Sequence, residues 1–379
     1  MDYKQNSRFK LAFIGGSLES IAGYPHLIAS QMDNRFEVIA GVFSSNKEIN
    51  LQTAQNWKIP SVYNTYQELL KNERSNIDAV VILIPTPLHS KIILELLKQN
   101  IPIICEKPLV SSLNELNAIK EIFDEQKNFL VVTNNYSAYP MVRELQQKIE
   151  NNVLGKILHI RLKMPQESFL RPPKSVKYPQ KWRLKDDFIP MISLDLGSHL
   201  HHLTYFLLQE EPSQIIAIYD SFSKYNIVDD VNISLKYESG IRGNLWLSKT
   251  AIGQRNGLSI EVYGDKASAL WHQENPEKLE ISYASGQKTI LDRGSDMEMP
   301  SNKLYNRMTP GHPAGFIESF ANLYNDIANS LEEFYNNQKY TNKYVYSFEH
   351  ASNGIKLLHA ASISNQQQQW ISMEEIINE

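Results

Sequence analysis

The chain has one cysteine among its 379 residues, Cys105, and no apolar run of the roughly 18 residues that a membrane-spanning helix needs. A single cysteine excludes a disulfide within the chain and fits a reducing compartment. The first residues, Met1–Asn6, also lack the long apolar core of a secretory signal. From these absences we expect a cytoplasmic protein that does not bind a membrane.

A large excess of charge of one sign is also lacking. The 38 Lys and Arg residues nearly balance the 42 Asp and Glu residues, and a net charge of -4 gives no electrostatic reason to expect nucleic acid as a partner. Hydrophobic residues make up 42% and charged residues 21%, which is ordinary for a globular protein. A chain of 379 residues exceeds what one core usually holds, so we expect two domains.

The first third of the chain alternates short apolar runs with longer polar-apolar segments. Segments such as 90–99 and 112–126 are long enough for helices. The alternation predicts βαβ crossovers, and hence an α/β domain over residues 1–138 with the doubly wound parallel sheet of a Rossmann fold. The expected strands are 10–15, 36–43, 79–84, 101–105 and 129–133.

From residue 139 the pattern changes, because strand-like segments follow one another. Residues 231–237 and 241–249 alternate polar and apolar side chains around a turn at Glu238-Ser239-Gly240, which predicts an antiparallel hairpin. We predict an α+β domain over residues 139–379, with an open, mostly antiparallel sheet and helices on one face. Its other expected strands are 157–164, 215–221, 258–263 and 267–272, and its expected helices are 140–151, 194–208, 315–333 and 349–364, the last two packing back towards the first domain.

The motif Glu106-Lys107-Pro108 follows one of the predicted parallel strands. Pro108 has no backbone N–H to donate to a neighbouring strand and therefore ends the strand. Lys107 is thus expected at the carboxyl end of a strand, which is where open α/β sheets bind their ligands.

The loop after the first strand contains Gly15, Gly16 and Gly23. A dinucleotide loop needs glycine where the backbone turns tightly beside the pyrophosphate and where the next helix packs closely. Residues 17–19, Ser-Leu-Glu, stand where further glycine is expected, and a carboxylate beside a pyrophosphate repels it unless it points away. Nucleotide binding and a simple strand-to-helix turn both explain this loop.

Two other strand ends carry candidate cofactor contacts. No acid follows the second strand to bind ribose hydroxyls, whereas Ser44, Ser45 and Lys47 can receive a 2′-phosphate, which tilts the choice between NAD and NADP weakly towards NADP. The same residues also suit a plain loop. After the third strand, Pro85 sets a rigid edge for a nicotinamide ribose, and His89 either faces that ligand or caps a helix.

Asp195 and His199 stand four residues apart, which places them on one face of a helix. A histidine accepts a proton from an alcohol near neutral pH, typically worth about 10²–10⁴-fold in rate, and a nearby carboxylate orients the ring. His201 and His202 suggest a metal, but their spacing faces different directions and no cysteine or acidic cluster completes a site, so we expect none. The alternative is a polar helix with an incidental Asp–His pair.

Together, the Glu106-Lys107-Pro108 motif, the Asp195/His199 pair and the domain order resemble the glucose–fructose oxidoreductase/inositol dehydrogenase (Gfo/Idh/MocA) family over almost the whole chain. The resemblance implies NAD(P)-dependent hydride transfer between nicotinamide and a secondary alcohol of a sugar, sugar derivative or cyclitol. Further stretches that support it are 135–143, 261–266, 310–313 and 315–318.

The resemblance also implies roles for individual residues. Lys107 would hydrogen-bond the nicotinamide ribose and the reacting oxygen, Asp195 would bind substrate, and His199 would take the hydroxyl proton. Glu106 and Asn135 would join the cofactor contacts. Candidate substrate contacts are Tyr136, Trp182, Arg183, His202 and His312, of which His312 lies in a Pro-Gly-His-Pro stretch that also suits a turn.

Two stretches differ from the family pattern: the glycine-poor residues 17–19, and residues 186–192, where a glycine-rich approach to Asp195 is expected. One alternative function is a non-catalytic regulatory protein that binds nucleotide or sugar. Another is a glycosidase of the same fold that uses tightly held NAD transiently. Family members commonly associate through the second sheet, whose outer face is mixed in polarity near Trp246, so the resemblance implies a homodimer or homotetramer.

Overall fold

The computed structural model describes residues 8–171, 179, 181–297, 299, 302–340 and 342–377. The N-terminal residues searched for a secretory signal, 1–6, lie outside this description. The chain divides into two compact units. The first unit consists of residues 1–110, 114–138 and 316–351, and the second of residues 111–113, 139–315 and 352–379. The late segment 316–351 is therefore counted with the first unit. No helix of the described residues is long and apolar enough to cross a membrane.

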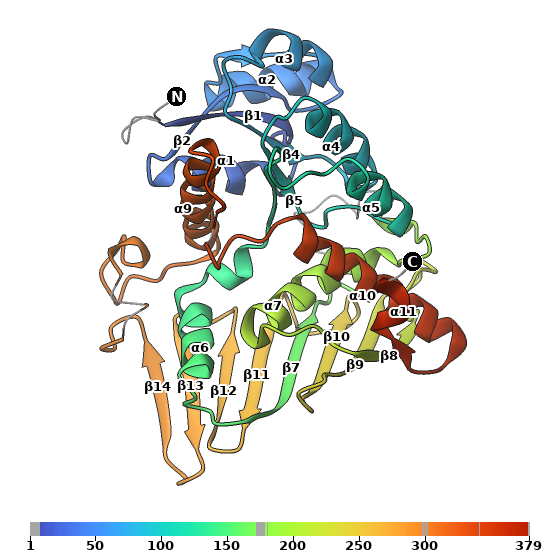
Figure 1. The fold of residues 1–379 in the computed structure, drawn as a ribbon, viewed down its shortest axis with the longest axis vertical. Helices are drawn as coiled ribbons and strands as arrows, with labels where there is room; N and C mark the ends of the chain where they lie inside the picture. The colour runs from blue at the N-terminus through green and yellow to red at the C-terminus, as the bar shows by residue number, and fades with distance from the viewer. Residues whose placement is uncertain are drawn as a thin grey trace. The chain divides into compact units, whose positions relative to one another are not determined.

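The first unit is built on a parallel sheet of six strands in the order β3-β2-β1-β4-β5-β6 (Figure 1). The strand order reverses between β1 and β4, and ligands bind beyond the carboxyl ends of strands at such a point. This confirms the predicted doubly wound sheet. The strands are β1 (Phe9–Gly15), β2 (Phe36–Val42), β3 (Ser61–Val62), β4 (Ala79–Leu83), β5 (Ile103–Glu106) and β6 (Leu130–Thr133).

Helices cover this sheet, and the 20-residue helix α9 (Phe316–Tyr335) joins them from far along the chain. Figure 1 shows α9 beside α1. Its apolar side chains Phe320, Tyr324 and Ile327 enter the same core as Phe9 and Phe13 of β1. The other helices of the unit are α1 (Gly23–Met32), α2 (Lys47–Trp57), α3 (Tyr66–Glu73), α4 (His89–Lys98) and α5 (Leu113–Lys120), with short turns η1 (Thr86–Leu88) and η2 (Asn135–Ala138).

The second unit is built on a sheet of nine strands in the order β14-β13-β12-β11-β7-β10-β9-β8-β15. Neighbours are antiparallel except β7 and β10, which run parallel, so the predicted open, mostly antiparallel sheet is confirmed. The predicted hairpin is β9 and β10. The strands are β7 (Ile157–Pro165), β8 (Gln214–Asp220), β9 (Asp230–Lys236), β10 (Arg242–Ser248), β11 (Ser259–Gly264), β12 (Ala267–His272), β13 (Lys278–Tyr283), β14 (Lys288–Asp292) and β15 (Ile371–Ser372).

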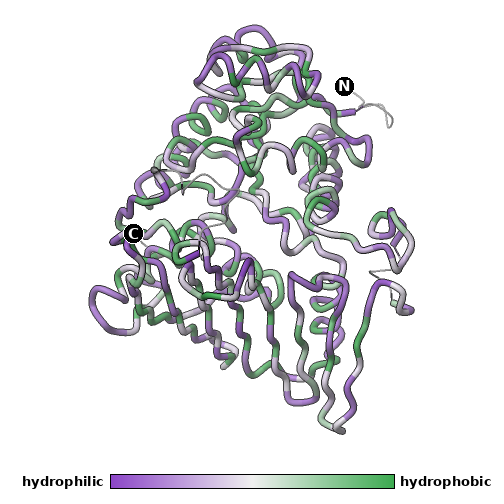
Figure 2. Tube along the Cα trace, turned by 180° about the vertical axis from the view of Figure 1, so that it is seen from behind, coloured by the Kyte–Doolittle hydropathy of each residue, from purple (hydrophilic) through white to green (hydrophobic). Residues whose placement is uncertain are grey.

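One face of this sheet is covered by helices, of which α6 and α7 lie over the strands in Figure 1. The strands alternate in hydropathy, as the tube in Figure 2 shows. In β9, for example, Ile233 is fully buried while Asn232 is exposed, and on β8 Ile218 is 55% exposed. The helices and turns are α6 (Pro140–Glu150), η3 (Lys181–Leu184), η4 (Ser193–Gly197), α7 (Ser198–Leu208), η5 (Lys303–Tyr305), most of α10 (Phe348–Gln367) and α11 (Met373–Ile377).

Candidate active site

The glycine loop follows β1 in the first unit. Gly15 and Gly16 have φ angles of +89° and +77°, a region that residues with a Cβ rarely adopt. Gly23 begins α1, and a Cβ placed on it would lie 1.9 Å from the carbonyl oxygen of Gly16. All three positions therefore require glycine, and together they pack a tight turn against a helix N-terminus. This is the local structure that accommodates a pyrophosphate, so these residues fit a dinucleotide.

The glycine-poor residues 17–19 form a compact turn within that loop. The carbonyl oxygen of Ser17 accepts from the backbone N–H of Ser20 at 2.8 Å, and the N–H of Leu18 donates to Oγ1 of Thr53 at 3.3 Å. Ser17 is buried, whereas Glu19 is exposed to solvent. Hydrogen bonds thus replace the missing glycine in shaping the turn, and the carboxylate lies on the surface.

The residues predicted to choose between NAD and NADP follow β2. Ser45 and Lys47 are exposed, and Lys47 is the first residue of α2. Oγ of the half-buried Ser44 accepts from the backbone N–H of Asn46 at 3.2 Å, and Asn46 caps α2. The described structure thus gives Ser44 a role in the turn and leaves Ser45 and Lys47 available to solvent.

Lys107 follows directly after β5 and is half-buried. The buried His89 ring supports the turn that follows it, because Nδ1 lies 3.0 Å from the carbonyl oxygen of Pro108 and 3.2 Å from that of Leu109. Nε2 of His89 lies 2.9 Å from the carbonyl oxygen of Ile84. Burial lowers the pKa of His89 in spite of these carbonyls, so the ring is neutral. His89 ties the loops after β4 and β5 together, while Pro85 precedes η1.

Glu106 belongs to a network of polar side chains that also includes His26, Tyr324 and Thr133. Nδ1 of His26 lies 2.7 Å from the hydroxyl of Tyr324, and its Nε2 lies 3.5 Å from Oε1 of Glu106. The hydroxyl of Thr133 donates to the same carboxylate oxygen at 3.0 Å. Burial raises the pKa of Glu106, but the hydrogen bond and charge of His26, the charge of Lys107 and the Thr133 hydrogen bond outweigh it, so the pKa is lowered. Glu106 is therefore ionised at neutral pH.

This lowered pKa predicts a pH-dependent contribution of Glu106 to stability. A carboxylate whose pKa is lowered by folding stabilises the folded state above its unfolded pKa, and loses that contribution as pH falls through the folded value. Glu106→Gln should therefore cost stability near pH 7 and progressively less below about pH 4. Urea unfolding of both proteins across this pH range measures the difference. A difference that does not change with pH would contradict the assignment.

Asn135 and Tyr136 lie in η2, after β6, and pack against α9. Nδ2 of Asn135 donates to Oγ of Ser319 at 3.0 Å, and the rings of Tyr136 and Phe316 are 6.2 Å apart. Both predicted residues are buried. Their side chains therefore fix η2 on α9 at the carboxyl edge of the sheet.

In the second unit, Asp195 lies in η4, a π-helical turn that runs directly into α7. Gly197 allows this path, because a Cβ there would lie 2.7 Å from Cδ2 of Leu358. His199, in the first turn of α7, is buried. The spacing of four residues predicted that Asp195 and His199 share one face of a regular α-helix. In the structure Asp195 lies in a π-helical turn, which is wider than an α-helical turn, and His199 lies in the α-helix that follows it. Such π-helical turns occur frequently at functional sites.

Two cations hold the Asp195 carboxylate. The NH1 of Arg183 and Nζ of Lys249 each lie 2.9 Å from its Oδ2. The guanidinium of Arg183 also lies over the ring of Trp182, 4.5 Å from the centroid, and Nζ of Lys249 donates to Oε1 of Gln166 at 3.0 Å. The structure thus brings together the predicted residues Trp182, Arg183 and Asp195. It adds Lys249, which follows β10 and was not predicted.

The other two histidines of α7, His201 and His202, contact side chains of the second unit. Nε2 of His201 lies 2.9 Å from Oε2 of Glu211. Burial, with a smaller contribution from the charge of His201, lowers the pKa of His202 to about 3, so His202 is neutral and packs near Phe206. In the part of the chain that the structure describes, no three His, Cys, Asp or Glu side chains are grouped so as to hold a metal ion.

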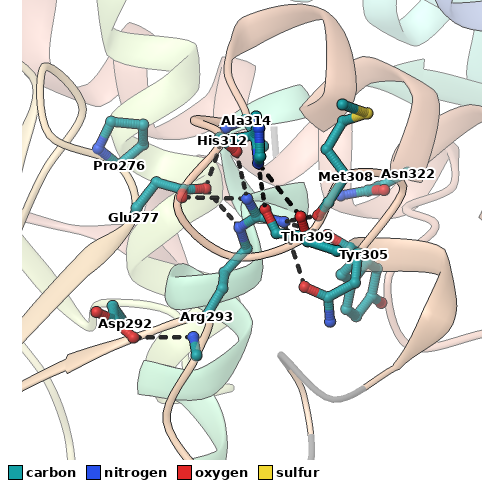
Figure 3. Close-up of polar contacts among 12 residues, drawn as sticks. Pro276, Glu277, Asp292, Arg293, Tyr305, Met308, Thr309, His312, Ala314 and Asn322 are labelled. Carbon is teal, nitrogen blue, oxygen red and sulfur yellow. Dashed lines mark hydrogen bonds and ion pairs between the residues drawn. The ribbon is translucent and has the colours of Figure 1, made fainter.

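His312 lies in an exposed loop that is organised by Arg293 (Figure 3). The buried guanidinium forms an ion pair with Glu277, with Nε 2.5 Å from Oε1. It also donates to the carbonyl oxygens of Tyr305 at 3.0 Å and of His312 at 2.8 Å. Nδ1 of His312 lies 3.2 Å from Oγ1 of Thr309. The Pro-Gly-His-Pro stretch is thus a turn whose backbone is fixed by one arginine.

We predict that Arg293→Met destabilises the second unit by about 3–5 kcal/mol, because it leaves Glu277 and several carbonyls without their buried partner. The expected changes are a lower urea midpoint and faster proteolysis in residues 305–314. Lys288→Met is the control. Lys288 forms an exposed ion pair with Glu280 between β13 and β14, and the loss of this pair should lower the stability by less than about 1 kcal/mol. Equal costs for both variants would show that the loop does not depend on Arg293.

Comparison with known proteins gives two family matches. Residues 9–134 match the model "Oxidoreductase family, NAD-binding Rossmann fold", and residues 142–270 match "GFO/IDH/MocA C-terminal domain". The chain is 26% identical to the Bacillus subtilis protein called "Uncharacterized oxidoreductase YfiI" over 334 residues, 85% of each chain. It is 24% identical to the myo-inositol 2-dehydrogenase of Thermotoga maritima over 332 residues, 84% of this chain and 86% of that protein.

The fold is also that of a solved structure. An inositol dehydrogenase homologue from Azotobacter vinelandii, complexed with NADH and myo-inositol, superimposes with a TM-score of 0.86 at 24% identity. The match covers 97% of this chain and 98% of that one.

Proposed function

The chain belongs to the Gfo/Idh/MocA family of oxidoreductases and contains its NAD-binding Rossmann domain, and from this premise we propose that it is an NAD(P)-dependent dehydrogenase. Its proposed substrate is a secondary alcohol of a sugar, sugar derivative or cyclitol. The observation that carries the proposal is Lys107 at the carboxyl end of β5, in a sheet whose Gly15–Gly23 loop fits a dinucleotide. The myo-inositol 2-dehydrogenase of Thermotoga maritima and the Azotobacter vinelandii homologue that is complexed with myo-inositol support the substrate class.

In the proposed reaction an alcohol carbon loses a hydride and its hydroxyl loses a proton, which leaves a ketone. The nicotinamide, when bound, accepts the hydride. The Lys107 ammonium hydrogen-bonds the reacting oxygen and stabilises the negative charge that develops on it. Asp195 accepts a hydrogen bond from a substrate hydroxyl. A neutral His199 accepts the hydroxyl proton on a ring nitrogen.

The cofactor is NAD or NADP. NADH is bound in the Azotobacter relative, which supports NAD. Ser45 and Lys47 at the carboxyl end of β2, and the absence of an acidic residue between positions 43 and 47, support NADP, because an acid there would bind ribose hydroxyls and repel a 2′-phosphate.

Titration of the purified protein with NADH and with NADPH, followed by energy transfer from tryptophan to nicotinamide, tests this function. Saturable binding of either nucleotide is expected, and a sugar and cyclitol screen with the matching oxidised cofactor should then produce absorbance at 340 nm. Binding without turnover of any sugar would favour a regulatory protein. Cleavage of a glycoside without net reduction of the nucleotide would favour a glycosidase.

A further inference from the structure

His26 is a fully buried histidine in α1, the helix that begins at Gly23 of the glycine loop. Two aromatic rings of α9 lie against it, with the ring centroid of Phe320 4.7 Å away and that of Tyr324 5.8 Å away. A polar ring in such surroundings lowers stability unless its nitrogens find polar partners. The partners of this ring therefore indicate what it does.

Tyr324 and Glu106 determine which ring nitrogen of His26 carries a proton. Burial, with a smaller contribution from the charge of Glu106, raises the pKa of Tyr324 well above its usual value, so the hydroxyl keeps its proton. That hydroxyl lies 2.7 Å from Nδ1 and can donate to it. Nε2 faces the ionised carboxylate of Glu106, which would repel a lone pair there. Nε2 therefore carries an N–H that points at Glu106.

The carboxylate of Glu106 is held through one of its two oxygens. The hydrogen bond from the hydroxyl of Thr133, at 3.0 Å, and the contact with Nε2 of His26, at 3.5 Å, both involve Oε1. Among the described residues no hydrogen-bond donor reaches Oε2, and the side chain is 14% exposed. One oxygen is thus fixed from α1 and β6, while the other can accept a hydrogen bond from a ligand.

The contact between Nε2 of His26 and Oε1 of Glu106 is long. At 3.5 Å it exceeds the usual upper limit of about 3.2 Å for an N–H···O hydrogen bond. The buried Nε2 has no other hydrogen-bond partner in the part of the chain that the structure describes. Buried polar atoms are rarely left in this way, and hydrogen bonds at functional sites often shorten when a ligand binds. The pair is therefore suited to a carboxylate that settles on a ligand.

The ligand expected at this place is the nicotinamide half of a dinucleotide. A doubly wound sheet binds the two halves of a dinucleotide on either side of the point where its strand order reverses. The candidate contacts for the adenosine half follow β2, so the nicotinamide half belongs over β4, β5 and β6. Glu106 ends β5 and Thr133 ends β6. A ribose hydroxyl is a donor that this half of the dinucleotide offers to a carboxylate.

We propose that His26, oriented by Tyr324, is a positioning residue of the cofactor site. It holds Oε1 of Glu106 so that Oε2 accepts a hydrogen bond from the ribose on the nicotinamide side of the dinucleotide. This inference rests on the proposed function and adds to its cofactor site two residues, in α1 and α9, that do not contact the nucleotide. Because α1 also begins at the glycine loop, His26 links the pyrophosphate site to the ribose site.

Binding of ADP-ribose and of ADP to the purified protein tests the proposal, because only ADP-ribose carries the second ribose. Their 2′-phosphorylated forms replace them if NADPH is the preferred nucleotide. In calorimetric titrations His26→Leu should raise the Kd of ADP-ribose and of the preferred dinucleotide by roughly tenfold or more, and that of ADP by less than about threefold.

Three results of these titrations would contradict the proposal. Equal losses for ADP-ribose and ADP would show that His26 only ties α1 to α9. Unchanged Kd values for all ligands would show that Glu106 needs no support from His26. A loss for the dinucleotide alone, with ADP-ribose unaffected, would exclude the ribose as the group that Glu106 binds.

A double-mutant cycle tests whether His26 acts through Glu106. Glu106→Met removes both carboxylate oxygens and should also weaken ADP-ribose by roughly tenfold or more. His26→Leu added to this variant should weaken binding by less than about a further threefold, because its effect depends on the carboxylate. Effects that multiply would show that the two residues act independently, and would refute the proposal.

Tyr324→Phe removes a single oxygen and provides the test if His26→Leu does not fold. It should raise the Kd of ADP-ribose by roughly threefold or more and leave that of ADP unchanged. Tyr335→Phe is the matched control, because the Tyr335 hydroxyl, also on α9, donates to the carbonyl oxygen of Asp78 at 2.6 Å, before the amino end of β4. The control should leave both ligands unaffected. Wild-type Kd values in Tyr324→Phe would count against the proposal.

These titrations require no turnover, so they separate this inference from the proposed function. Selective loss of ADP-ribose binding in the variants would support the role of His26 even if no sugar alcohol is oxidised. Turnover of a sugar by the wild type, together with unchanged ADP-ribose binding in the variants, would leave the dehydrogenase in place and remove His26 from its cofactor site.

Discussion

Lys107→Met is expected to lower kcat for hydride transfer by about 10²–10³-fold while the protein stays folded and still binds nucleotide. Methionine keeps the unbranched length of the side chain but removes the ammonium that would stabilise the charge developing on the reacting oxygen. Lys107 is half-buried at the end of β5, where removal of this charge leaves less water to replace it than at an exposed position.

Single-turnover measurements at saturating nucleotide and substrate check this expectation, because they report the chemical step without product release. Lys98→Met is the control, since Lys98 is an exposed lysine in the last turn of α4 and its loss should leave turnover unchanged. A Lys107→Met enzyme with turnover within a few-fold of the wild type would exclude the assigned role.

Gly23→Ala is expected to weaken NADH or NADPH binding by at least tenfold and to destabilise the first unit by roughly 1–3 kcal/mol. The added methyl group would lie 1.9 Å from the carbonyl oxygen of Gly16, and neither can rotate away, because the Cβ is fixed by the backbone of residue 23 and the oxygen is itself a backbone atom. The start of α1 must therefore move from the glycine loop, which removes the close approach that a pyrophosphate requires.

Nucleotide titration and thermal unfolding of the variant measure the two effects. Gly294→Ala is the control, because Gly294 has no positive φ angle and a Cβ there would lie near side chains alone, 3.2 Å from Oδ1 of Asp292 and 3.4 Å from Cβ of Pro310. This control should retain wild-type affinity and stability. If Gly23→Ala behaves like the control, the loop tolerates a shifted helix and the contact between Gly16 and Gly23 is not needed for binding.

Much of the fold was predictable from the sequence because its strands are marked locally. The buried parallel strands β1 and β4 are continuous apolar runs, and β9 and β10 alternate regularly around a glycine turn. The shortest strands, β3 and β15, have two residues each and exist only because a neighbouring strand supplies their partners. The predicted helix 112–126 ends at Lys120, as α5.

The candidate site was predictable only where a residue type and its position along a strand suffice. Lys107 and Gly15 follow from strand ends, which the apolar runs define. His26 and Lys249 were missed because their significance lies in partners that are distant in the chain. The His26 ring meets Tyr324 across 298 positions, and Lys249 meets Asp195 across 54. A histidine within an otherwise apolar helix face was the one local signal for His26.

The place of α9 in the first unit has a consequence for how the chain matures during synthesis. The core around β1 includes Phe320, Tyr324 and Ile327, which are translated after residues 139–315, the larger part of the second unit. At about 5–20 residues per second, the ribosome needs roughly ten to forty seconds to travel from Ala138 to Phe316. During that interval the nascent first unit exposes the apolar surface that α9 will cover. The core of the first unit is therefore completed only after residues 139–315 of the second unit have been synthesised.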